Sequence, residues 1–235
     1  MIQRRRTYAA PLWSADVFVL RHIGGFVRPR IASLVRRGAA VLDAGCGEQP
    51  LRSAIESAGA TYTGLDVEQN RAGTVDVVAP LWRVPLPDAS ADVILATEVL
   101  EHVADTDGAF AEMARLLREG GAIVITTPFA YPLHELPHDY VRLTTGAIRN
   151  LAERHGLTVA EVHALGNELE VLAVTFNNLA ANILAPLPFA LRAAAALVRL
   201  PLNAVINLLA TIFSAALGPV LPKKSYLTTA AVLTK

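Results

Sequence analysis

The strongest constraint on the fold is the stretch AAVLDAGCGEQPLRSAIESAGATYTGLDVEQN, which spans residues 39–70. It starts with a short apolar run, Ala39 to Ala44, which is followed at once by Gly45 and Gly47. Residues 51–58 place their apolar side chains on one helical face, and Thr61 to Asp66 is a second apolar run. The stretch therefore predicts a strand, a tight turn, a helix and a second strand.

The same alternation continues along the chain. Further strands are predicted at Thr74 to Val78, Ala91 to Thr97, Ala122 to Thr126 and Leu157 to Val162. Helices between them are predicted from a cap at Asp105 or Thr106 to Gly120, and from Thr144 or Thr145 to Gly156. Strands separated by helices are the signature of a mostly parallel, doubly wound sheet, so we expect an α/β fold of the Rossmann-like type.

The segment before the first strand has apolar residues at helical spacing. Gly24, Gly25 and Pro29 interrupt this pattern over residues 14–37. Because glycine and proline weaken or break a helix, the segment predicts two short helices rather than one.

Charge is distributed unevenly along the chain. Basic and acidic residues number 21 each, so the net charge gives no indication of a nucleic-acid partner. All the acids lie at or before Glu170, whereas residues 171–235 hold only basic charges. The first part of the chain therefore has a net charge of about −5 and the second about +5.

Cysteine content and the first residues bear on the compartment. Cys46 is the only cysteine, which excludes an intramolecular disulfide and fits a reducing environment. Residues 4–6 are arginines, as at the start of a signal peptide, but Pro11 and Asp16 interrupt the apolar stretch that should follow. We therefore expect a cytoplasmic protein.

The glycine turn favours a ligand other than a phosphate. A dinucleotide site would need a third glycine at position 50, where the chain has Pro50, and the Gly-Lys-Ser/Thr of a P-loop is absent from the sequence. Asp43, directly before the turn, would repel a phosphate but suits a ligand that carries a cation. Asp66, at the end of the second strand, can accept both hydroxyls of a ribose. A cationic amino acid joined to a nucleoside meets both demands.

Four segments in this order resemble the class I S-adenosylmethionine-dependent methyltransferases, and among them the methyltransferase type 11 domain. They are VLDAGCGEQP, YTGLDVE, VPLPDASADVILATEVLEHV and ARLLREGGAIVITTP, and the resemblance covers residues 36–165. It implies a seven-stranded sheet whose sixth strand is followed by an antiparallel seventh, for which Tyr226 to Thr234 is the candidate. It also implies S-adenosylmethionine as the cofactor.

The resemblance assigns a role in cofactor binding to several residues. Asp43, Gly45 and Gly47 would surround the methionine portion, Asp66 would hold the ribose hydroxyls, Val67 would lie against the adenine, and Glu98 would line the floor near the sulfonium. Cys46 lies in the same turn and is counted with the cofactor-binding residues. Because no histidine near it in sequence could activate it, we predict a small filler rather than a nucleophile.

The chain departs from the family pattern at two places. Gln49 stands where many relatives have a third glycine, and residues 79–81 lack the acid that contacts the adenine amine, so we expect a backbone contact at Leu81 instead. Structural alternatives remain open for the acids: Asp43 as a helix cap, and Asp66 as a turn residue. For Glu101 and His102 we favour a structural pair at a helix end.

The loop after the fifth strand, PFAYPLHELPHDYVRLTTGAIRN, holds the candidate reaction chemistry. In doubly wound sheets ligands bind beyond the carboxyl ends of the strands, which this loop can reach. We predict His134 as a general base, Glu135 or Asp139 as the residue that orients it, and Tyr140 as a pocket wall.

Two other interpretations of this loop are considered. His134, Glu135, His138 and Asp139 have side chains of metal-ligand type, but Pro137 lies between the histidines and is incompatible with a helical His-Glu-x-x-His site, so we predict no metal. Alternatively, the loop is a surface segment pinned by an ion pair between Asp139 and Arg142.

An apolar, acid-free segment that contains several prolines, residues 171–222, follows the sixth strand. Leu200 to Pro222 is long enough to span a bilayer, but Pro201, Asn203 and Asn207 make it a poor span, and two interfacial or hairpin-forming helices fit better. The absence of acids suits an anionic membrane surface, and the alternative is that the helices cover the sheet or a second copy of the chain.

These observations predict four parts. They are a helical lead-in (1–38), an S-adenosylmethionine-binding core (39–170), an apolar helical insertion (171–222) and the final strand (223–235). The function expected is methyl transfer to oxygen, on a small-molecule or lipid-linked acceptor, with the insertion in peripheral contact with the inner face of the membrane or with a partner in a homodimer. The alternative is a non-catalytic scaffold with the same fold.

Overall fold

The computed structural model describes residue 8 and residues 10–218, 220–221 and 224–235. The arginines at residues 4–6, and Pro222 and Lys223 at the boundary predicted for the last part, lie outside the described residues.

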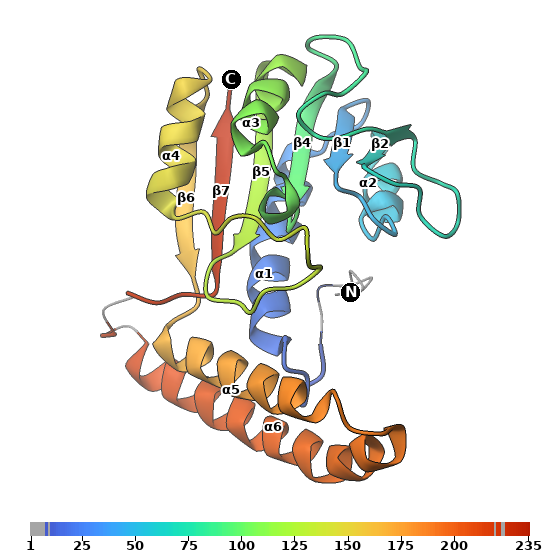
Figure 1. The fold of residues 1–235 in the computed structure, drawn as a ribbon. Helices are drawn as coiled ribbons and strands as arrows, with labels where there is room; N and C mark the ends of the chain where they lie inside the picture. The colour runs from blue at the N-terminus through green and yellow to red at the C-terminus, as the bar shows by residue number, and fades with distance from the viewer. Residues whose placement is uncertain (1–7, 9, 219, 222–223) are drawn as a thin grey trace.

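One seven-stranded sheet forms the centre of the molecule (Figure 1), in the order β3-β2-β1-β4-β5-β7-β6. The strands are β1 (Ala40–Ala44), β2 (Thr61–Asp66), β3 (Val77–Val78), β4 (Ala91–Thr97), β5 (Leu117–Pro128), β6 (Thr158–Leu165) and β7 (Thr228–Thr234). Strands β1 to β5 pair in parallel, and β7 is antiparallel to both β5 and β6. The predicted doubly wound fold with an antiparallel last strand is confirmed.

Helices cover both faces of the sheet because adjacent strand residues point to opposite sides. They are α1 (Val17–Leu34), α2 (Arg52–Ser57), α3 (Thr106–Leu116) and α4 (Thr145–Arg154), with a single 3-10 turn, η1 (Leu100–His102), among the described residues. Ile94 packs with α3 and α4 in one apolar cluster, whereas its neighbours Val93 and Leu95 pack with α1 in the other. The sheet is therefore buried on both faces over its central strands.

The predicted helix starts are confirmed. Asp105 caps α3 by accepting a hydrogen bond from the Gly108 amide, and Thr144 caps α4 by accepting one from the Ala147 amide. The predicted end of α3 at Gly120 is wrong, because β5 already begins at Leu117 and pairs there with Ala91. The third strand is also shorter than predicted.

The prediction of two short helices before the first strand is wrong. α1 is one helix of 18 residues with Pro29 inside it. Its buried face, which includes Phe18, Ile23 and Val27, packs onto the sheet, and this packing outweighs the local cost of the proline. In addition, the guanidinium of Arg30, the residue after Pro29, donates a hydrogen bond to the Phe26 carbonyl of the same helix.

Two long helices lie between β6 and β7, as predicted. α5 (Glu168–Leu184) and α6 (Phe189–Leu217) form a hairpin that lies beyond the carboxyl ends of the parallel strands (Figure 1). By length and composition α6 could cross a membrane, and it is the one such helix among the described residues. An 18-residue stretch of α6 has a mean hydropathy of 1.8, and only 11% of that stretch is buried.

Asparagines join this hairpin to the segment before α1. The side-chain amide of Asn207 donates to the carbonyls of Leu12 (2.6 Å) and Ser14 (3.0 Å) and accepts from Asn177 (2.9 Å). Both asparagines are fully buried. The polar residues that argued against a membrane span therefore face the protein, and many of the apolar residues face outward.

Candidate active site

The glycine turn follows β1 at the carboxyl edge of the sheet. Gly45 and Gly47 have φ values of 66° and 50°, which glycine adopts without the steric cost that a side chain brings. The Gly47 amide donates to Oδ2 of Asp66 at 2.8 Å, and the Val67 amide donates to Oδ1 at 2.8 Å. The turn and the acid at the end of β2 are thus held together.

Asp43 lies at the interior side of this turn. It is 1% exposed, and its Oδ2 accepts a 2.7 Å hydrogen bond from the hydroxyl of Tyr62 on β2. Burial, reinforced by the Asp43 carboxylate, raises the pKa of Tyr62 well above its usual range, so the phenol remains a donor. Asp43 is therefore held by the neighbouring strand directly before the turn, and its direct contact with a ligand stays a prediction.

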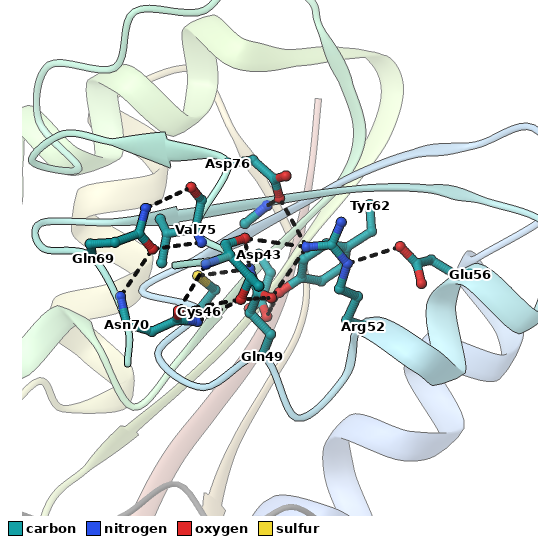
Figure 2. A network of polar contacts seen from close by, with 12 residues as sticks. Asp43, Cys46, Gln49, Arg52, Glu56, Tyr62, Gln69, Asn70, Val75 and Asp76 are labelled. Carbon is teal, nitrogen blue, oxygen red and sulfur yellow. Dashed lines mark hydrogen bonds and ion pairs between the residues drawn. The ribbon is translucent and has the colours of Figure 1, made fainter. Parts of the chain in front are cut away.

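Gln49 takes the place of the third glycine and connects the turn to the next loop. Its φ is 54°, its Nε2 donates to the Thr74 carbonyl at 2.7 Å, and its Oε1 accepts from the Thr74 hydroxyl at 2.9 Å. Asn70 donates to the Gly47 carbonyl at 3.1 Å. Figure 2 shows this network, in which the departure from the family pattern supplies a side chain that fixes the loop after β2.

The other residues predicted for the cofactor occupy different environments. Cys46 is fully buried within the turn, as its role of filler requires. Val67 is 68% exposed, next to Asp66. The Leu81 side chain is buried in the core. A contact of Val67 or of the Leu81 backbone with adenine stays a prediction.

The donors and acceptors at this edge fit the nucleoside cofactor that the sequence resemblance implies. Each carboxylate oxygen of Asp66 accepts one backbone hydrogen bond and retains a second acceptor position for a ribose hydroxyl. β1 lies between β2 and β4, so the turn, Asp66 and Glu98 share one edge. Glu98 directly follows β4 with a φ of 51° and is fixed by its amide, which donates to the Thr126 carbonyl.

The loop after β5 brings His134 to the same edge. Its Nδ1 lies 3.3 Å from Oδ2 of Asp139, and Asp139 also accepts from the His134 amide. Arg142 forms an ion pair with Asp139, which one of the two alternative interpretations of the loop predicted. The hydrogen bonds from Arg142 lower the pKa of Asp139 to about 2. Burial and the neighbouring His102 lower the pKa of His134, so its neutral form is favoured.

The two candidates for orienting His134 are distinguished by position. Asp139 is the acid beside His134, whereas Glu135 lies with Oε2 3.7 Å from Nε2 of His102. Tyr140 is half exposed, and its hydroxyl lies 2.8 Å from Nδ1 of His138. The pairing with His138 turns Tyr140 toward the outer part of the loop.

Glu101 and His102, which the sequence favoured as a structural pair, lie against the histidine loop. Nε2 of His102 and Nε2 of His134 are 3.6 and 3.9 Å from Oε1 of Glu101, and the two imidazole centroids are 4.7 Å apart. The Tyr140 amide donates to the Glu101 carbonyl at 2.8 Å, which ties the loop to η1. Sequence reasoning missed this contact because Glu101 and His134 belong to different segments, and the pattern around each gives no indication of the other.

The N-terminal segment also reaches this edge, which the sequence did not predict. The hydroxyls of Tyr8 and Thr97, the last residue of β4, lie 3.3 Å apart. Tyr131 donates to Oδ1 of Asp16 at 2.7 Å, so the loop after β5 is joined to the start of α1. The sequence shows a tyrosine at residue 8 and another at residue 131, but the partners Thr97 and Asp16 lie too far away in sequence for either contact to be inferred.

Comparisons with known proteins agree with this geometry. Residues 42–125 match the family model described as a methyltransferase domain. The chain is 30% identical over 175 residues to a ubiquinone biosynthesis O-methyltransferase of Aromatoleum aromaticum, covering 57% of this chain and 75% of that protein. It is 33% identical over 107 residues to a malonyl-[acyl-carrier protein] O-methyltransferase of Serratia marcescens, covering 42% of each.

Solved structures share the fold. An S-adenosylmethionine-dependent methyltransferase from Mesorhizobium loti superposes with a TM-score of 0.56 at 16% identity, over 94% of this chain and 98% of that one. For several curated relatives, however, the chain spans less than half of their length.

Proposed function

The chain belongs to the class I S-adenosylmethionine-dependent methyltransferases of the type 11 group, and we propose that it methylates a hydroxyl oxygen of a small-molecule or lipid-linked acceptor. The observation that carries the proposal is the meeting of two sites at one edge of the sheet, the glycine turn with Asp66 and the loop with His134. Two of its relatives are O-methyltransferases by name, which supports oxygen as the acceptor atom.

The chain's part in the reaction is to position the acceptor and take up its proton. When bound, the cofactor supplies an activated methyl group on a sulfonium, so little further activation is required. Asp66 would hold the ribose, and Glu98 would line the floor next to the sulfonium. Neutral His134 would accept the hydroxyl proton, with Asp139 stabilising the resulting imidazolium.

The outer face of the helical hairpin supports a membrane-bound acceptor as part of this proposal. Leu172, Phe189, Leu197 and Val198 are each at least 67% exposed. No acid occurs after Glu170, so residues 171–235 carry only positive charge, which complements an anionic lipid surface. We propose peripheral attachment to the inner face of the cytoplasmic membrane, where a lipid-linked hydroxyl would be within reach of the site.

Methyl transfer is tested by incubating the chain with cofactor labelled in its methyl group and a cell extract divided into aqueous and lipid phases. We expect label in the lipid phase, in an alkali-stable ether, and much less label with the Asp66→Asn variant; label in an alkali-labile ester would show that a carboxylate is methylated instead of a hydroxyl. Cofactor binding without label in either phase would leave the non-catalytic scaffold as the better interpretation.

Membrane attachment is tested by sedimentation with vesicles of phosphatidylglycerol or of phosphatidylcholine alone. The double variant Leu197→Glu and Val198→Glu should bind the anionic vesicles about tenfold more weakly or worse, since it removes about 1–2 kcal/mol of burial per side chain. Val78→Glu, at an exposed residue of β3, is the matched control. If the chain does not bind vesicles but forms a dimer through Leu197, the proposed membrane attachment is wrong and the exposed apolar face serves self-association.

A further inference from the structure

Three donor atoms from two segments converge beside the glycine-turn site. One ligand atom from each of Glu101, His102 and His134 lies within 4.8 Å of the others. Glu101 is fully buried, and the two histidine side chains are 17% and 14% exposed. The cluster is therefore enclosed by protein while remaining reachable from the loop side.

The distances inside the cluster are close to those that a shared cation requires. Oε1 of Glu101 lies 3.6 Å from Nε2 of His102 and 3.9 Å from Nε2 of His134, which is beyond hydrogen-bonding distance. Ligands at about 2.0–2.2 Å from a tetrahedral zinc lie roughly 3.3–3.5 Å from one another. The two separations from Glu101 are therefore within about half an ångström of metal-binding geometry, and the remaining one, between the two imidazole nitrogens, is bounded by 4.8 Å.

The other nitrogen of each imidazole is already engaged. Nδ1 of His102 lies 2.6 Å from the His138 carbonyl, and Nδ1 of His134 lies 3.3 Å from the Pro132 carbonyl. Carbonyl oxygens only accept, so each Nδ1 carries the hydrogen and each Nε2 presents its lone pair toward Glu101. Asp139 beside Nδ1 of His134 completes the carboxylate–histidine arrangement that supports metal ligands.

We propose that Glu101, His102 and His134 bind a divalent transition-metal ion of the zinc class. Two imidazoles and one carboxylate suit zinc or iron(II) better than magnesium. Glu135, whose Oε2 is 3.7 Å from Nε2 of His102, is positioned to be a fourth ligand or to yield its place to a substrate oxygen. The sequence-based expectation of no metal weighed His134, Glu135, His138 and Asp139. Of these, the His138 carbonyl and the Asp139 carboxylate contact the Nδ1 atoms of the two histidine ligands.

The role of the ion rests on the proposed function. A hydroxyl coordinated by the metal loses its proton more readily, because the cation stabilises the alkoxide. In the metal-bound chain, His134 would be a ligand rather than the base, and the proton of the coordinated hydroxyl would pass to the Glu135 carboxylate, displaced by the substrate oxygen, or to water. Metal binding itself does not depend on methyl transfer and can be measured alone.

The test is titration of the chelator-treated full chain with Zn²⁺ by calorimetry, with Mg²⁺ in parallel. We expect one zinc site with a Kd below about 1 μM and much weaker magnesium binding. His102→Gln and His134→Gln should each weaken zinc binding about tenfold or more, and unfolding curves establish that both variants fold. His163→Gln, which removes an exposed histidine on β6, is the matched control.

Zinc binding that is absent, or that is unchanged in both histidine variants, would overturn the site. The two proposals fail separately. Zinc that binds through these histidines without any methyl incorporation leaves the site standing and removes the proposed function. Methyl transfer that proceeds in a chain without a zinc site leaves the function standing and removes the metal.

Discussion

The hydroxyl of Tyr62 donates a 2.7 Å hydrogen bond to Oδ2 of Asp43, so the second strand holds the buried acid that precedes the glycine turn. Tyr62→Phe should lower the free energy of unfolding by about 1–3 kcal/mol, because a buried carboxylate loses a donor. Urea denaturation measures the change. Tyr140→Phe, at a half-exposed tyrosine, should leave the unfolding free energy unaltered; equal effects of the two variants would contradict a special role for Tyr62.

Asp66→Asn should weaken cofactor binding by about tenfold to a hundredfold. The amide offers one acceptor oxygen where the carboxylate offers two, so either the Gly47 or the Val67 amide loses its partner, and a ribose hydroxyl loses an ionised acceptor. Calorimetry with S-adenosylhomocysteine checks this. Glu68→Gln, at an exposed neighbour, is the control, and an affinity within about twofold of the parent chain would rule out the ribose role.

Glu112 provides a stability effect that depends on pH. Hydrogen bonds from Arg115 hold the pKa of Glu112 below its usual 4.5. Its contribution is therefore present above pH 4.5 and is lost as the pH falls through the lowered folded value. Glu112→Gln should cost about 1–2 kcal/mol at about pH 7 and progressively less in acid. The free energy of unfolding is measured across pH, with Glu153→Gln as control. The curves of the parent and the Glu112 variant should converge as the pH falls, and parallel curves would refute the linkage.

Asn207→Ala should loosen the helical hairpin from the segment before α1. The variant removes the donor to the Leu12 and Ser14 carbonyls and the acceptor of Asn177, which should cost about 2–4 kcal/mol. Hydrogen exchange should increase at residues 12–14 first. Asn182→Ala, at an exposed position of α5, should leave exchange there unchanged, and the idea fails if both variants behave alike.

Local sequence patterns were sufficient for most of the fold. The apolar run before Gly45 predicted β1, and Asp105 and Thr144 predicted the starts of two helices, because strand burial, tight turns and helix caps depend on neighbours in the chain. The continuity of α1 could not be predicted in this way, since the sheet that stabilises it across Pro29 is formed by residues far along the chain.

The residues of the candidate site also fall into those that local sequence patterns could identify and those that they could not. Asp66 and the glycines could be singled out because each follows directly on a predicted strand. The approach of His134 to Glu101 depends on how separate segments meet in space. Nothing in the local pattern around His102 indicates that His134 approaches the same carboxylate, and the proposed metal site rests on that approach.

Strand β7 lies between β5 and β6 although it is the last of the seven along the chain. While residues 228–234 are still on the ribosome, β5 and β6 cannot pair through it, and the apolar hairpin has already begun to emerge. The nascent chain thus exposes its apolar hairpin before its sheet can close. Under the membrane attachment proposed above, the hairpin would reach the lipid surface first and the sheet would be completed afterwards.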